Sequence, residues 1–124
     1  MGRVISILMT QQRKDLGDWG EDAAAEYLAK KNYKILGRKV RTRVGEIDLL
    51  AQDGMTLVVV EVKAKADASR GTPEEMVDWK KQRKLIRLAK EVNQKFPAFG
   101  IRIDVVAIEG KEIRHHISAV EDGR

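Results

Sequence analysis

The sequence predicts an α/β domain with a mixed central sheet flanked by helices. Three observations predict this class. The expected elements follow in the order helix, three strands, helix, strand. An Asp53-Gly54 turn signal separates two apolar strands. The 124 residues, 43% of them hydrophobic, suit a single globular core. We expect one domain over residues 15–120, preceded by a loosely held tail over residues 1–14.

Residues 16–32 predict the first helix, because the segment is rich in alanine and Asn32 suits a helix end. One face of this helix carries mostly small residues, so it can approach a sheet closely. Glu21 lies on the same face and would be carried inward with it. The residues of this face are Gly17, Gly20, Glu21, Ala24 and Leu28.

Three strands are expected next, over residues 33–43, 45–51 and 56–64. Gly37 interrupts the first of them and suggests a bulge. A polar loop then leads to a long helix over residues 78–96, with Asp78 as its N-cap. The apolar stripe of this helix is formed by Leu85, Leu88, Ala89, Val92 and Phe96.

A further buried strand is expected over residues 101–108, and residues 112–120 suggest a short final strand or turn. Asp104 interrupts the buried strand, and we expect it to pair with an arginine or lysine. His115 and His116 are adjacent, so in a strand they face opposite sides and make a poor chelating pair. We assign these histidines no role.

Charged residues interrupt the two strands of the expected hairpin. Because side chains alternate along a strand, the four charged residues share one face of the sheet with Leu50, Leu57 and Val59: Glu46, Asp48, Glu61 and Lys63. The opposite face would hold an ordinary core of Ile47, Leu49, Val58, Val60 and Val62. The sequence thus predicts a compact acidic cluster with a lysine beside it.

Carboxylates only a few ångströms apart raise one another's pKa, and such a cluster is costly unless a cation occupies it. A small set of oxygen ligands selects Mg²⁺ or Mn²⁺, and a nearby ammonium suits a site that also binds phosphate or activates water. The alternative is an edge-strand charge pattern that discourages aggregation, with Lys63 pairing Glu61. The residue pattern alone leaves both interpretations open.

Five ordered sequence pieces resemble a known family. They are GDWGEDAAAEYL, GEIDLL, VEVKAK, KKQRKLIRLA and RIDVVAI, which together span about residues 17–108. This pattern resembles the YraN family of bacterial proteins, which are predicted nucleases of the PD-(D/E)XK superfamily, and it is similar to archaeal Holliday junction resolvases. The resemblance implies a restriction-endonuclease-like fold. The chain departs from the pattern at Ile47, where the superfamily name has proline, and at Lys65, where we expect arginine.

The resemblance also implies roles for individual residues. Asp48, Glu61 and Lys63 match the catalytic motif. The metal ligands would be Asp48, Glu61, the backbone carbonyl of Val62 and Glu21 from the first helix. Lys63 would orient or help deprotonate the attacking water, or hold the scissile phosphate. Glu46 would be a carboxylate behind these ligands or a ligand to a second metal, and it ranks below Asp48.

The net charge of +5 favours an anionic partner, with nucleic acid ahead of a membrane surface. Two basic runs, residues 38–43 and 81–90, flank the acidic hairpin in the sequence. The nucleic-acid-binding residues that we select from these runs and from the end of the hairpin are Arg41, Arg43, Lys65, Lys81, Gln82 and Arg83. A solvated helix face is the alternative for the second run. Trp19 and Trp79 could stack on bases, but we expect both to be partly buried anchors.

We therefore predict a Mg²⁺- or Mn²⁺-dependent endonuclease acting on DNA, including structured or branched DNA. The alternative is a non-catalytic nucleic-acid-binding or scaffold protein that retains the fold. By analogy with resolvases we expect a homodimer. The absence of cysteine excludes disulfides and thiolate metal sites and suits a cytoplasmic location. No segment approaches the ~20 apolar residues of a membrane span.

Overall fold

A single mixed sheet of five strands organises the computed structural model, which describes residues 18–122. Its strands lie in sequence order: β1 (Lys34–Arg41), β2 (Glu46–Asp53), β3 (Thr56–Lys65), β4 (Gly100–Glu109) and β5 (Glu112–His116). Only β3 and β4 pair in parallel, and the other neighbours are antiparallel. The predicted α/β class with a mixed sheet is confirmed, and the arrangement is consistent with a restriction-endonuclease-like fold. The tail predicted over residues 1–14 lies outside the described residues.

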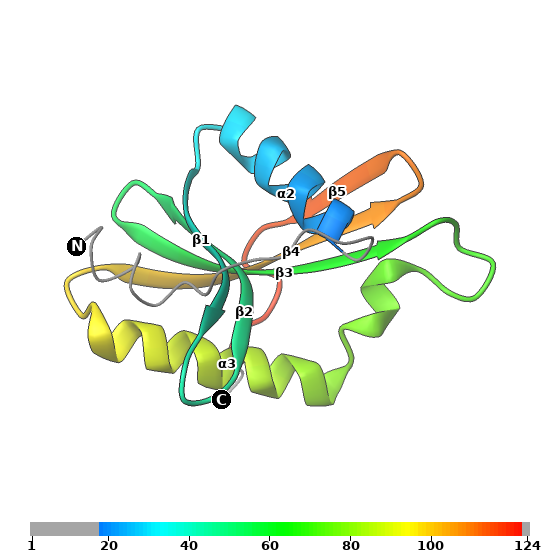
Figure 1. Ribbon diagram of the computed structural model, residues 1–124. Coiled ribbons are helices and arrows are strands. Elements are labelled where there is room, and N and C mark those ends of the chain that lie inside the picture. The colour runs from blue at the N-terminus through cyan, green and yellow to red at the C-terminus, as the bar shows by residue number, and fades with distance from the viewer. Residues whose placement is uncertain (1–17, 123–124) are drawn as a thin grey trace.

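Two helices cover the sheet from opposite sides (Figure 1). Helix α2 (Trp19–Lys30) precedes β1, and α3 (Trp79–Lys95) forms the crossover between the parallel strands β3 and β4. A short 3-10 helix, η2 (Pro73–Met76), precedes α3 within the predicted polar loop. Within residues 18–122, neither α2 nor α3 has the length and apolar composition that a membrane span requires.

The strand alternation of β3 divides the core into two layers. Leu57 and Val59 pack toward α3, while Val58 and Val60 pack toward α2. All four are fully buried, because β3 is the central strand and both of its faces are covered. Glu61, the next residue of β3, is therefore also buried.

Local signals explain where the elements begin and end. The Asp78 carboxylate accepts a hydrogen bond of 2.8 Å from the backbone N–H of Lys81, which confirms it as the cap of α3. Asn32 ends α2 with φ 71°, a left-handed conformation that asparagine tolerates. The register of β1 shifts between Ile35 and Gly37, which confirms the predicted bulge.

One predicted core position was wrong. Ile47 was expected on the side of Leu49, but it packs with Leu50 in the layer that faces α3. The reason is local. The pairing of β2 with β3 ends at Leu49, so strict alternation no longer applies to the residues before it.

A buried polar network surrounds Asp104, which is fully buried. The predicted pairing with an arginine is confirmed, because Nε of Arg102 lies 2.9 Å from its carboxylate. His115 also bonds this carboxylate at 2.7 Å and contacts the edges of the Tyr27 and Tyr33 rings. Nothing in the sequence pattern indicated this role for His115, which joins β5 to β4 beneath α2.

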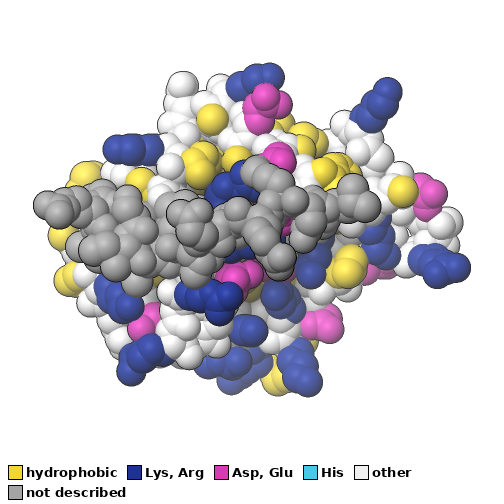
Figure 2. Space-filling model, viewed as in Figure 1, with side chains coloured by type: hydrophobic (Ala, Val, Ile, Leu, Met, Phe, Trp, Pro, Cys, Tyr) yellow, Lys and Arg dark blue, Asp and Glu magenta, His cyan; other side chains and the backbone are white. Residues whose placement is uncertain are grey.

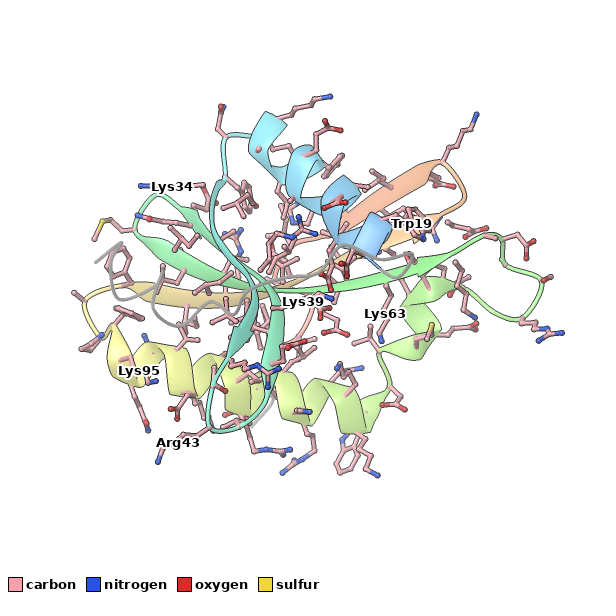
Figure 3. All side chains as sticks on the ribbon, viewed as in Figure 1. Trp19, Lys34, Lys39, Arg43, Lys63 and Lys95 are labelled. Atoms are coloured by element: carbon pink, nitrogen blue, oxygen red, sulfur yellow. The ribbon has the colours of Figure 1, made fainter. Side chains whose placement is uncertain are left out.

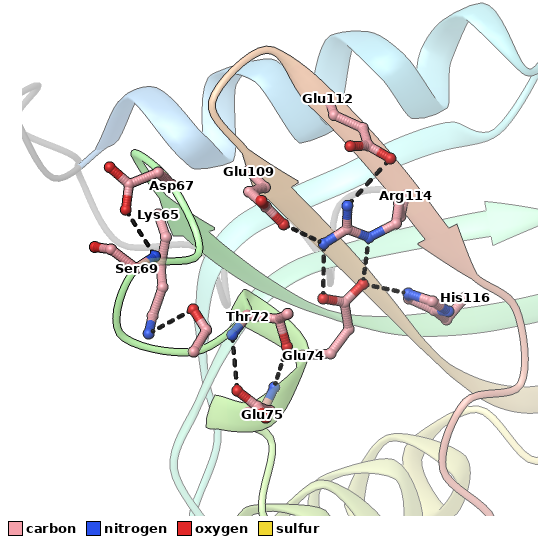
Figure 4. A network of polar contacts seen from close by, with 11 residues as sticks. Lys65, Asp67, Ser69, Thr72, Glu74, Glu75, Glu109, Glu112, Arg114 and His116 are labelled. Carbon is pink, nitrogen blue, oxygen red and sulfur yellow. Dashed lines mark hydrogen bonds and ion pairs between the residues drawn. The ribbon is translucent and has the colours of Figure 1, made fainter.

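A second polar network ties η2 to β5 (Figure 4). Arg114 donates two hydrogen bonds to Glu74, at 2.7 and 2.9 Å, and also contacts Glu109 and Glu112. His116 bonds the same Glu74 carboxylate at 2.8 Å. The hydrogen bonds from Arg114, with a smaller contribution from His116, lower the pKa of Glu74 to about 2. This network fixes the segment that leads into α3.

We predict that Glu74→Gln lowers stability at pH 7 by about 1–2 kcal/mol, a value reduced to allow for the partial exposure of this carboxylate. Its folded pKa lies below the ordinary glutamate value of 4.5, so the stabilisation is present above pH 4.5 and is lost as the pH falls toward 2. Denaturant unfolding at pH 7 and pH 3 measures the difference. Glu112→Gln, at a more exposed partner of Arg114, is the control and should lose less. Equal losses in the two variants would contradict this prediction.

Candidate functional site

The site begins where β2 separates from β3. The last residue pair between these strands is Leu49 with Val60. One residue further, the Asp48 side chain takes over: its Oδ2 accepts a hydrogen bond of 2.8 Å from the backbone N–H of Val62. A carboxylate thus replaces a backbone carbonyl as the acceptor for β3. This bond fixes Asp48 in the opening between the two strands.

Glu61 follows the buried run of β3 and is itself buried, with 4% of its side chain exposed. Lys63 Nζ lies 3.5 Å from its Oε2, and Lys81 Nζ approaches the same oxygen from α3 at 3.4 Å. Burial first, and the neighbouring Asp48 second, raise the pKa of Glu61 to about 7, although both lysines act in the opposite direction. The structure therefore brings Asp48 and Glu61 together as close neighbours.

Glu21 reaches the site from α2. The helix can come close because Gly20 faces the sheet, where an added Cβ would lie 3.1 Å from the Cβ of Ala64. Only 14% of the Glu21 side chain is exposed. Burial raises its pKa, and the charge of Asp48 adds to this effect. Its Oε1 is buried, and among residues 18–122 it has no hydrogen-bond partner, only the 3.5 Å ion pair with Lys39 Nζ.

Lys39 also belongs to the site, although the sequence pattern did not indicate it. Its Nζ contacts Asp18 at 2.7 Å and Glu21 at 3.5 Å. Its backbone is left-handed, with φ 48°, a conformation that costs a non-glycine residue roughly 1–3 kcal/mol. In the sequence Lys39 is one of several basic residues in a run, and nothing there signals its backbone conformation. Figure 3 shows Lys39 and Lys63 between the two helical layers.

The cluster contains more buried negative charge than its hydrogen bonds satisfy. Within the described part of the chain, one oxygen of Glu21 has no hydrogen bond, and Glu61 has a strongly raised pKa even with two ammonium groups nearby. Oxygen ligands of this kind fit a hard divalent cation. Within residues 18–122, however, no three histidine, cysteine, aspartate or glutamate side chains converge closely enough to hold a metal ion. The carboxylates would have to draw together to share one.

The remaining predicted site residues have different surroundings. Glu46 is exposed at the start of β2. The Arg43 guanidinium bonds both carboxylate oxygens of the buried Glu91, at 3.0 and 3.2 Å, and so ties the β1–β2 turn to α3. The Lys65 ammonium donates to the backbone carbonyls of Arg70 and Gly71 and holds the loop after β3.

Three predicted residues lie on or beside the basic face of α3. Lys81 points at Glu61, and the Gln82 side chain donates to the carbonyl of Val77 at 2.9 Å. Arg83 is exposed. Arg41, the last of the predicted nucleic-acid contacts, is exposed at the end of β1. Several of these basic groups therefore support the fold as well as the surface charge.

A shallow groove of about 410 Å³ runs along the start of α3, beside Lys81. It is lined by Met76, Asp78, Lys80, Lys81, Lys84 and Arg87. Lysine and arginine side chains gather over this part of the molecule in Figure 2. The acidic cluster is thus bordered by a positively charged surface, an arrangement that suits a polyanion whose phosphate must reach the carboxylates.

Comparison with known proteins gives a consistent match. A sequence model described as "Uncharacterised protein family UPF0102" matches residues 20–108. A "UPF0102 protein" of Persephonella marina is 44% identical over 80% of this chain and 87% of its own length. One from Syntrophotalea carbinolica is 40% identical, covering 91% of this chain and 97% of its own. These names give a family and no activity.

The burial of Glu61 predicts a pH effect in protein freed of divalent cations. Its folded pKa of about 7 lies above the ordinary glutamate value of 4.5. The stability contributed by this group is therefore highest below pH 4.5 and falls as the pH rises toward 7. The loss is about 3 kcal/mol at most. Glu61→Gln should remove this part of the pH dependence and be at least as stable as the parent protein at pH 8. Melting curves from pH 5 to 8 in EDTA measure it, and a variant less stable than the parent at pH 8 would contradict the assignment.

Proposed function

The chain belongs to the uncharacterised protein family UPF0102, and on that premise we propose that it is a metal-dependent endonuclease that hydrolyses phosphodiester bonds in DNA. UPF0102 is the YraN family that the five sequence pieces predicted, so this prediction is confirmed. One observation carries the proposal: the buried carboxylate of Glu61 and the half-buried carboxylate of Asp48 are close neighbours where two strands separate, and the Lys63 ammonium lies 3.5 Å from Glu61.

The residues that would hold the metal are Glu21, Asp48 and Glu61, together with the backbone carbonyl of Val62. The unsatisfied oxygen of Glu21 and the raised pKa of Glu61 support this assignment. A bound Mg²⁺ or Mn²⁺ would polarise a phosphoryl oxygen and lower the pKa of a water molecule. The hydrogen bond from Val62 N–H holds Asp48 in place for this role.

The lysines supply the positive charge that a phosphodiester requires. Lys63 lies on the same strand as Glu61, two residues further on, so both side chains point to the same side of β3. From there Lys63 orients the attacking water or holds the scissile phosphate. Lys81 reaches the same carboxylate from α3 and is a second donor to the phosphate. Glu46 is exposed at the start of β2 and is not one of the ligands proposed for this metal ion; it stays a candidate ligand for a second one.

A non-catalytic nucleic-acid-binding protein is the second candidate. The observation that favours it is the pairing of Lys63 and Lys81 with Glu61 in a region where, among the described residues, no three potential metal ligands converge. In that case the lysines would be permanent partners of the carboxylate. Calorimetric titration with Mn²⁺ separates the two candidates, because only the nuclease should bind the ion and lose it on Asp48→Ala.

The decisive experiment is a cleavage panel on end-labelled single strands, duplexes, flaps and four-way junctions with Mg²⁺ or Mn²⁺. Asp48→Ala, purified in the same way, is the control for contaminating nucleases. We expect cleavage by the parent protein and none by the variant. Equal cleavage by both would place any activity outside this site. Gel filtration of the same samples tests the proposed homodimer.

Glu61→Gln and Lys63→Ala should fail in different ways. Glu61→Gln removes a charged ligand, so metal binding and cleavage should be lost together. Lys63→Ala should bind Mn²⁺ as well as the parent protein or better, because a positive neighbour is gone, and should still lose at least about tenfold in cleavage rate. Calorimetry and single-turnover cleavage measure the two effects. If Lys63 merely pairs Glu61, the variant changes stability by at most ~1 kcal/mol and cleaves normally.

Binding to DNA should depend steeply on salt. Several lysines and arginines of α3 border the site, and each phosphate contact releases counterions. If four to six contacts form, affinity should fall by roughly 100-fold or more between 50 and 200 mM salt. Fluorescence anisotropy with a labelled oligonucleotide in EDTA measures this. An affinity that stays constant over this range would contradict the basic surface as the binding site.

A further inference from the structure

Trp79 is exposed at the start of α3, contrary to the expectation of a partly buried anchor. It is the first residue of the helix, and 70% of it is accessible to solvent. Met76, three residues earlier, is also exposed, at 45%. A large aromatic side chain that is not needed in the core and sits on a rigid helix end is a candidate for contact with a partner.

The charge around Trp79 indicates the kind of partner. The Arg83 guanidinium lies over the indole at 5.1 Å from the ring centroid and holds it by a cation–π contact. The groove beside it carries Lys80, Lys84 and Arg87. An exposed aromatic ring beside a basic groove is the combination by which proteins bind single-stranded nucleic acid without sequence preference.

Trp79 lies near Lys81 in the sequence but on the other side of α3. Lys81, whose ammonium lies 3.4 Å from Glu61, is two residues further along the helix, and a step of two residues turns the side-chain direction by about 200°. Lys80 and Lys84 line the groove on this part of the helix, so a strand whose phosphates follow the groove can bring one base to the indole ring while another of its nucleotides lies at Lys81. A base can stack there only if it has left its own base pair.

We propose that Trp79 stacks on an unpaired base of a strand whose phosphates lie along the basic groove of α3, so that the preferred substrate is single-stranded DNA or DNA with an unpaired stretch. This inference rests on the proposed nucleic-acid function and specifies its substrate class. A membrane surface is the less suitable partner, because the apolar part of this face consists of one indole and one methionine, while the groove is lined by lysines and an arginine, among them Lys81, whose ammonium lies 3.4 Å from Glu61.

The test uses Trp79 as its own reporter. The sequence has two tryptophans, so Trp19→Phe leaves Trp79 as the sole indole. In EDTA, where no cleavage is expected, oligo-dT should quench the fluorescence of this variant. Trp79→Ala should weaken oligo-dT binding by about 5- to 100-fold, the usual effect of losing one base stack, and Trp79→Phe should restore most of it. Trp19→Ala is the matched control, and it should bind like the parent protein.

The outcomes separate this inference from the proposed nuclease function. If Trp79→Ala and the parent protein bind oligo-dT equally, or if the parent binds an intact duplex as tightly as a single strand, the stacking inference is wrong whether or not the protein cleaves DNA. If stacking is seen and no substrate is cleaved with Mg²⁺ or Mn²⁺, the nuclease proposal fails and this inference stands. Trp79 fluorescence that responds to anionic phosphatidylserine vesicles and not to oligo-dT would assign the face to a membrane.

Discussion

The hydrogen bond from Val62 N–H to the Asp48 carboxylate is the contact on which the site depends. It stands where the β2–β3 ladder ends and occupies the donor that a backbone carbonyl would otherwise take. The opening between the strands leaves space for charged side chains in an otherwise apolar sheet. Glu61 enters this opening next to Asp48, and burial then makes its charge costly.

That cost explains why lysines from three elements converge on the carboxylates. Lys63 and Lys81 approach Glu61 from β3 and α3, and Lys39 approaches Glu21 from β1. Lys39 accepts a left-handed backbone in doing so. Strain of this kind persists only where the surroundings hold it, and here the ion pair with the buried Asp18 does so. The acidic cluster therefore shapes the backbone as well as the side chains around it.

Much of this arrangement could be predicted from alternation and turn chemistry. Strand period two placed Glu61 and Lys63 on one side of β3, the hairpin brought Asp48 beside Glu61, and the small face of α2 carried Glu21 inward. The failures have local causes. Ile47 lies where the ladder ends, so period two no longer applies there. The roles of Lys39 and His115 depend on a backbone conformation and on contacts across the sheet, and a sequence does not display either.

The lysines that stabilise the buried carboxylates are also the groups that would receive DNA. Lys63 and Lys81 can turn to a phosphate only if another positive charge replaces them at Glu61, because an unpaired buried carboxylate would cost several kcal/mol. On the proposed function, cation and DNA binding should therefore strengthen each other. The same exchange explains how three carboxylates, which within residues 18–122 do not converge closely enough to hold a metal ion, would form a catalytic site once both partners are bound.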